Sequence, residues 1–104
     1  MLMSTTHLRT HSTRQVNAAV LDATHKAARA IEALSENGFT VTDVELKSVS
    51  RPTIRIQTSG QCHTLIAKGE AVYFSFGKRE RVGQYREGQF QLGGCRIVWT
   101  EIGN

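Results

Sequence analysis

At 104 residues, the chain has the length of one domain and no room for a second. Its formal net charge of +4 is moderately basic, which suits a polyanionic partner without requiring one. No segment is long and apolar enough to span a membrane, and the first residues lack the apolar core of a signal peptide. We therefore expect a cytoplasmic protein without a membrane partner, in which Cys62 and Cys95 are buried as small hydrophobic residues. A disulfide or a reactive thiol is the alternative.

Residues 1–11 are polar and show no periodicity, which predicts a flexible N-terminal arm before a single domain over residues 12–104. His7, Arg9, His11 and the adjoining Arg14 give the arm a weak positive charge. Two interpretations remain open. The segment is either a disordered terminus with no role or a basic arm that orders on an acidic partner.

One long amphipathic helix is predicted from Ser12 to Phe39. Its apolar residues recur at the helical steps of three and four: Val16, Val20, Ala23, Ala27, Ile31 and Leu34. Ser12 and Gln15 match a capping box at the start. Gly38 provides a stop, because glycine tolerates the positive φ of a Schellman motif and allows Phe39 to pack back on Leu34.

Short strands are predicted after the helix. Residues 40–49 form a first strand with a bulge near Thr42 and Asp43, where the apolar parity changes. Pro52 precedes a second strand over residues 53–57, which alternates cleanly and turns inward at Ile54 and Ile56. Ser59-Gly60 is typical of a hairpin turn, so residues 62–68 are interpreted as the returning strand.

The remaining strands follow the same rule of alternation. Val72, Phe74 and Phe76 predict a third core strand, with the charged loop 77–83 after it. A turn at residues 87–88 precedes a strand over residues 89–92. The glycine pair 93–94 then leads to a final strand over residues 96–101.

This order predicts an α+β fold in which one long N-terminal amphipathic helix packs on a curled antiparallel β-meander of four to six strands. No internal repeat or low-complexity segment interrupts it.

The residue pair Cys62-His63 is the first candidate for chemistry. On a regular strand the two side chains point to opposite faces, and no second cysteine or histidine pair completes a zinc site. A buried Cys62 with a surface His63 is the favoured interpretation. No phosphate-loop spacing is present at residues 77–79. We therefore expect no enzyme activity, no metal and no cofactor.

A basic and aromatic set is the better candidate for a binding site. Arginine and tyrosine together suit both phosphate backbones and protein hot spots. The set comprises Arg51, Arg55, Tyr73, Lys78, Arg79, Arg81, Tyr85 and Arg86. The competing interpretation is an ordinary solvated loop, since charge keeps turns and sheet edges soluble.

Two motifs resemble those of short, mostly uncharacterised bacteriophage and prophage proteins. They are the segments Arg51-Pro52-Thr53-Ile54-Arg55-Ile56 and Gly94-Cys95-Arg96-Ile97-Val98-Trp99, supported by Gly38-Phe39-Thr40-Val41 and by Cys62 with Leu65. The resemblance covers about the last two-thirds of the chain. It implies a small accessory protein of the bacterial cytoplasm that binds a host complex, and it transfers no functional residue.

Three functions follow as hypotheses. The first is a phage-encoded accessory protein that inhibits a host protein or ribonucleoprotein complex stoichiometrically, with anti-CRISPR activity as its sharpest form. Because the chain is basic, such an inhibitor contacts protein and does not mimic DNA. The second is a nucleic-acid-binding regulator that uses the basic set. A small enzyme is the third and least favoured, and pairing into a homodimer is a further possibility.

Overall fold

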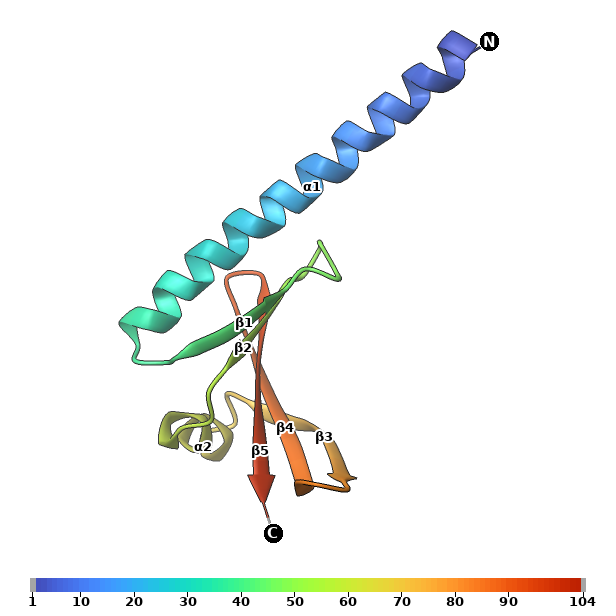
Figure 1. Cartoon of the computed structure of the whole chain (residues 1–104). Helices are drawn as coiled ribbons and strands as arrows, with labels where there is room; N and C mark the ends of the chain where they lie inside the picture. The colour runs from blue at the N-terminus through green and yellow to red at the C-terminus, as the bar shows by residue number, and fades with distance from the viewer. Residues whose placement is uncertain (1, 104) are drawn as a thin grey trace.

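The computed structural model describes residues 2–103, and the side chains of residues 12–103. It contains two helices and five strands among these residues (Figure 1). The elements are α1 (Leu2–Glu36), β1 (Val41–Glu45), β2 (Thr53–Ile56), α2 (Gly60–Ala67), β3 (Val72–Arg79), β4 (Gly83–Leu92) and β5 (Cys95–Gly103). The predicted α+β fold class is confirmed. Neither described helix is both long and apolar enough to cross a membrane.

Helix α1 begins at Leu2, so the predicted start at Ser12 is wrong. No proline or glycine precedes Ser12, and nothing in the sequence stops the helix from extending in that direction. The proposed capping box of Ser12 and Gln15 therefore lies inside the helix. The side chains of residues 1–11 lie outside the described part of the structure. The proposal that this segment is a flexible arm therefore stays a prediction.

The C-terminal end of α1 is the predicted Schellman motif. The amide of Phe39 donates to the carbonyl of Leu34 at 2.9 Å, and that of Gly38 donates to Ser35 at 3.1 Å. Gly38 takes φ of +84°, which explains why glycine stands there. The motif turns the chain directly into β1.

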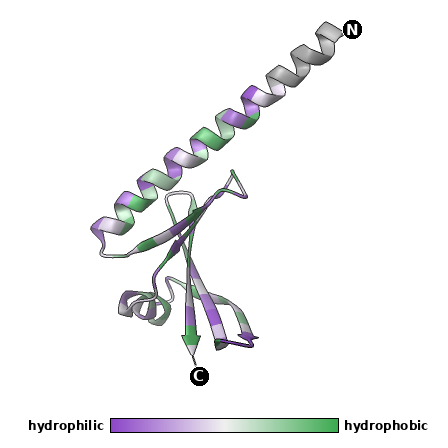
Figure 2. Cartoon of the chain, viewed as in Figure 1, coloured by the Kyte–Doolittle hydropathy of each residue, from purple (hydrophilic) through white to green (hydrophobic). Residues whose placement is uncertain are grey.

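Among the described side chains of α1, those that pack on the sheet lie in its second half. Its buried residues are Ala23, Ala27, Ala30 and Leu34. Val16 is 58% exposed and Val20 is also exposed, so the prediction that the whole apolar stripe is buried is wrong for these two residues. The sheet is shorter than the helix, and residues 12–20 of α1 project beyond it (Figures 1 and 2).

Segment 60–67 is a helix, and the strand predicted over residues 62–68 is wrong. Its apolar residues Cys62, Leu65 and Ile66 stand three and four apart and pack together into the core. Ser59, expected in a hairpin turn, is the N-cap residue, and its carbonyl accepts from the Cys62 amide at 3.1 Å. The segment is only eight residues long, so its period was too short to outweigh its β-branched residues.

The sheet has the strand order β1-β2-β5-β4-β3. Helix α2 carries the chain from β2 to the far edge, and the antiparallel meander β3-β4-β5 then returns to the centre. Strand β5 consequently lies parallel to β2, with Ile54 beside Ile97. The sheet is therefore mixed, whereas a wholly antiparallel meander was predicted. The predicted irregularity near Thr42 is confirmed as a register shift between Val41 and Asp43.

Two details of the meander differ from prediction. Strand β4 is continuous, so no turn occurs at Glu87-Gly88. In β3 the predicted core residues Val72, Phe74 and Phe76 are exposed, whereas Tyr73 packs against the core. Tyr73 reaches a hydrogen-bond acceptor there, which an apolar ring cannot use.

The core lies between the sheet and both helices. Trp99 is fully buried at its centre, with Ile54 and Ile97 beside it. Cys62 and Cys95 are buried and unpaired with each other, which confirms their predicted role as small hydrophobic residues. The Trp99 indole covers Gly88 so closely that a Cβ on this residue would overlap the ring.

This packing gives a first prediction. We expect Gly88→Ala to lower the free energy of unfolding by about 1–3 kcal/mol or more, because the added methyl overpacks the core. Gly60→Ala is the matched control, since a Cβ there meets no atom within 4 Å. We expect it to be neutral or stabilising. Denaturant unfolding of both variants measures the difference, and equal stabilities would contradict the account.

Candidate binding groove at the hairpin end of the sheet

The β3–β4 turn and the last residues of β5 meet at the end of the sheet that points away from α1 (Figure 1). We call this region the hairpin end. It contains a groove of about 540 Å³. The groove is lined by Phe76, Gly77, Lys78, Gln84, Tyr85, Arg86, Glu101, Ile102 and Gly103. Phe76 is 69% exposed, and Ile102 is exposed as well. The groove thus combines accessible apolar surface with cationic side chains.

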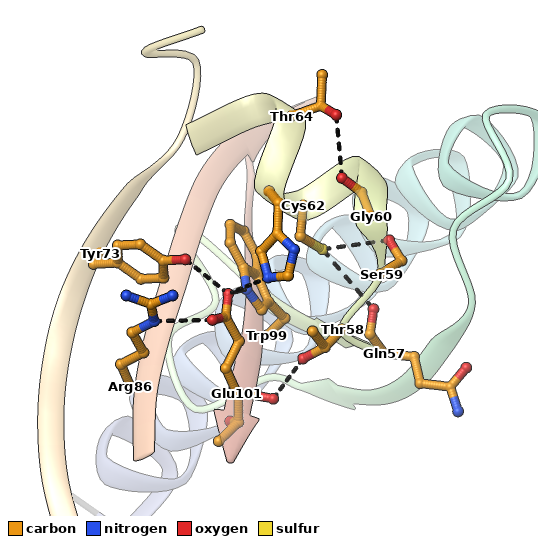
Figure 3. Close-up of polar contacts among 12 residues, drawn as sticks. Gln57, Thr58, Ser59, Gly60, Cys62, Thr64, Tyr73, Arg86, Trp99 and Glu101 are labelled. Carbon is orange, nitrogen blue, oxygen red and sulfur yellow. Dashed lines mark hydrogen bonds and ion pairs between the residues drawn. The ribbon is translucent and has the colours of Figure 1, made fainter. Parts of the chain in front are cut away.

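The carboxylate of Glu101 stands at the inner side of the groove, and the Glu101 side chain is only 11% exposed. Oε2 accepts hydrogen bonds from Trp99 Nε1 at 2.8 Å and from the Tyr73 hydroxyl at 2.9 Å. Oε1 accepts from Arg86 Nε at 2.9 Å. Figure 3 shows these three side chains directed toward Glu101. His63 Nε2 from α2 lies 3.3 Å from Oε2.

These contacts keep Glu101 ionised. Burial alone raises the pKa of Glu101, but the hydrogen bonds from Trp99, Arg86 and Tyr73 outweigh burial, and the pKa lies below its usual value. The pKa of Tyr73 is raised, first by burial and then by its bond to the carboxylate. The same carboxylate raises the pKa of Arg86.

The Glu101 cluster is suited to holding elements together. It joins β5 to β4 through Arg86, to β3 through Tyr73 and to α2 through His63. The Arg86 guanidinium also lies over the Tyr73 ring, with Cζ 4.1 Å from the ring centroid. An ionised carboxylate that already accepts three hydrogen bonds is poorly prepared to act as a general base. We therefore interpret the cluster as the support of the groove.

The predicted basic and aromatic set does not form one surface, because the sheet divides it. Tyr73 and Arg86 lie on the face that carries the helices, together with Glu101. Tyr85 and Arg79 lie on the opposite face, where the Tyr85 ring covers Gly77. The Arg79 guanidinium stacks on the Tyr85 ring, with Cζ 4.7 Å from the ring centroid.

Two further members lie away from the groove. Arg51 is exposed in the β1–β2 connection, near the other end of the sheet. Arg55 is on the helix-free face, where it pairs with Glu45 at 2.7 Å and Glu87 at 3.1 Å. Its charge is thus balanced inside the protein, and the hydrogen bond from Arg55 is the main reason that the pKa of Glu45 is lowered.

Three cations of the set remain together at the hairpin end. Lys78, Arg79 and Arg81 are exposed and take part in no ion pair with a described residue. Phe76 and Val82 of the same hairpin are also exposed. Phe76 shares a face of the sheet with Lys78, whereas Arg79 lies on the opposite face. That these residues form a binding site stays a prediction.

The sequence reasoning missed Glu101, Trp99 and His63 as members of this region. A signal for the first two was present, since residues 99 and 101 share one parity of the last strand and a carboxylate there faces the core side. His63 was given a strand conformation, which concealed its proximity to Glu101. Within the described residues, no group of three or more His, Cys, Asp or Glu side chains is arranged to hold a metal ion.

The chain belongs to the family whose model matches residues 6–102, which is described only as an uncharacterised protein. No curated protein and no solved structure matches the chain.

The support role of Glu101 gives a second prediction. We expect Glu101→Gln to lower the free energy of unfolding at pH 7 by about 2 kcal/mol, because a nearly buried carboxylate loses the charge that its hydrogen-bond donors stabilise and one of its acceptor oxygens becomes a donor. The pKa of Glu101 is lower in the folded than in the unfolded protein. The extra stability of the wild type over the variant is therefore complete above the pKa of the unfolded state, about 4.3, and is lost as the pH falls through the lower pKa of the folded state. Urea unfolding between pH 7 and pH 3 measures both effects.

Glu45→Gln is the control, since Glu45 also pairs with an arginine but its side chain is 35% exposed. We expect a smaller loss at pH 7. A wild-type advantage over Glu101→Gln that stays constant down to pH 3 would contradict the assignment.

Proposed function

We propose that this protein is a phage-encoded accessory protein that acts in the bacterial cytoplasm by binding a host macromolecular complex and inhibiting it stoichiometrically, without catalysis. Anti-CRISPR activity is the sharpest form of the proposal. The resemblance of residues 51–56 and 94–99 to short phage and prophage proteins supports the context.

The observation that carries the proposal is the composition of the hairpin end. Lys78, Arg79 and Arg81 are exposed without an ion pair among the described residues, and Phe76 is exposed beside them. Aromatic and arginine side chains dominate protein hot spots, and cations at the rim steer an acidic partner. A support fixed by Glu101 reduces the entropy lost on binding.

The sign of this charge also defines the mode of inhibition. Three cations with only Glu80 between them produce a local positive potential at the turn. Such a surface complements an acidic protein patch and is unlike the phosphate array that a DNA mimic imitates. The partner surface is therefore proposed to be acidic protein.

The third prediction tests the location of the binding surface. We expect the double variant Lys78→Glu/Arg81→Glu to capture about tenfold less of the host complex from bacterial lysate than the wild type. Two cations that attract an acidic partner are replaced by carboxylates that repel it. The matched control is Lys47→Glu/Arg51→Glu, which changes the net charge equally at exposed positions in the β1–β2 connection. This control should capture the complex in the same fixed stoichiometry as the wild type.

Inhibition is measured with the same variants in cells with active CRISPR defence, as the plating efficiency of a targeted phage. The proposal requires that the wild type and the control variant raise the plating efficiency and that Lys78→Glu/Arg81→Glu does not. Equal behaviour of the two double variants would contradict the docking surface. Absence of any protein complex in the capture would contradict the function.

A nucleic-acid-binding regulator is the second candidate, and one contact favours it. The Arg79 guanidinium stacked on Tyr85 forms a planar cationic platform on the helix-free face of the hairpin end, and single-stranded nucleic acids bind such combinations by stacking and phosphate contact. A mobility-shift titration at two salt concentrations tests it. Binding that weakens steeply with salt, and with a smaller slope after Arg81→Glu, would support it. No shift at low salt excludes it.

A further inference from the structure

Strand β3 forms one edge of the sheet, and β4 is its only neighbour among the described strands. Along its outer side, backbone groups of an eight-residue strand therefore lack a strand partner within the described chain. Such an edge is a template for another strand unless it is protected.

The two edges of the sheet are protected to very different degrees. Strand β1, at the other edge, has only five residues, carries the acidic Asp43 and Glu45, and packs beside α1. Strand β3 contains an uncharged run of six residues from Val72 to Gly77 and no proline. Short length and charge are the usual protections of an edge, and this run has neither.

The unprotected run also exposes large apolar side chains. Val72 is 56%, Phe74 37% and Phe76 69% exposed. Opposite charges stand on its two sides, with Glu70 before the run and Lys78 and Arg79 after it. An antiparallel copy of the same segment would therefore meet apolar residues at the centre and the opposite charge at each end.

The bulge between Tyr73 and Ser75 fixes which residues can face each other. Because of it, Val72 and Gly77 lie on the same face of the sheet, opposite Gln89 and Tyr85 of β4. Tyr73 and Phe76 share the other face, and their ring centroids are 6.2 Å apart. Antiparallel pairs share a face, so Val72 can oppose Gly77 of a second copy, and Tyr73 can oppose Phe76.

We propose that a second copy of this chain adds to β3 in antiparallel orientation, which joins two five-stranded sheets into one across a two-fold axis between Phe74 and Ser75. In this register the uncharged runs overlap completely, and Glu70 of each copy opposes Arg79 of the other. Lys78 and Arg81 stay outside the uncharged run and remain available to a partner, whereas Phe76 and Arg79 belong to both proposed surfaces, so host binding through them competes with the dimer. The bulge twists the edge, so the dimer is reversible and dependent on concentration.

The fourth prediction is a charge exchange followed by sedimentation equilibrium across a concentration series. Arg79→Glu and Glu70→Arg should each weaken dimerisation by about tenfold, because each places like charges together at two symmetric points. The double variant Glu70→Arg/Arg79→Glu should restore the wild-type constant, since the pair is re-formed with its partners exchanged. Phe76→Lys should give a monomer, because lysine protects an edge.

Circular dichroism checks that each variant is folded. We expect all of them to fold, because the side chains of Glu70, Phe76 and Arg79 are exposed. A wild type that stays monomeric at every concentration would overturn the proposal. So would a dimer that is indifferent to Arg79→Glu and Glu70→Arg, or a double variant that fails to recover. If a strand of a different protein occupied this edge, the wild type and the double variant would both bind that protein, and each would stay monomeric on its own. That result also contradicts the proposal.

Discussion

The ionised carboxylate of Glu101 is the contact on which the hairpin end depends. Arg86, Tyr73 and His63 reach it from β4, β3 and α2, and Trp99 donates from β5 itself. Hydrophobic packing around Trp99 holds these elements together but has no direction, whereas hydrogen bonds to one carboxylate fix their relative positions. The exposed surface formed by Lys78, Phe76 and Arg81 is consequently presented on a firm support, as a stoichiometric binding protein requires.

The parts of the fold that were predictable are those with a local physical cause. The glycine stop at Gly38, the bulge near Thr42 and the alternation of β2 and β5 each depend on a few neighbouring residues. Helix α2 was missed because eight residues contain barely two turns, and Leu65 and Ile66 suit a strand equally well. The projection of α1 was missed because the length of its sheet partner is not encoded in the helix. The parallel pairing of β2 with β5 follows from the crossover through α2. The missed helix and the wrongly predicted wholly antiparallel sheet therefore have the same origin.

The candidate site was predictable in its composition but not in its arrangement. Adjacent residues such as Tyr85 and Arg86 point to opposite faces of β4, so closeness in sequence separated them in space. The phenylalanine rings of β3 were predicted to be buried, yet Tyr73 packs against the core, where its hydroxyl donates to Glu101, and Phe76 is exposed on the same face nearer the turn. The acceptor that organises this choice lies 28 residues further along the chain, where no local pattern links it to Tyr73. The exposed turn kept its predicted character because a charged loop needs no distant partner.

The central claim is that Glu101 specifically supports the hairpin end. Amide hydrogen exchange of the wild type and of Glu101→Gln tests it most directly, because exchange reports local opening segment by segment. The account predicts a larger loss of protection over residues 60–67 and 72–87 than in β1, β2 and the packed part of α1 from Ala23 to Leu34, where the loss does not exceed the change in global stability. An equal loss of protection in all elements, or none in residues 72–87, would contradict it.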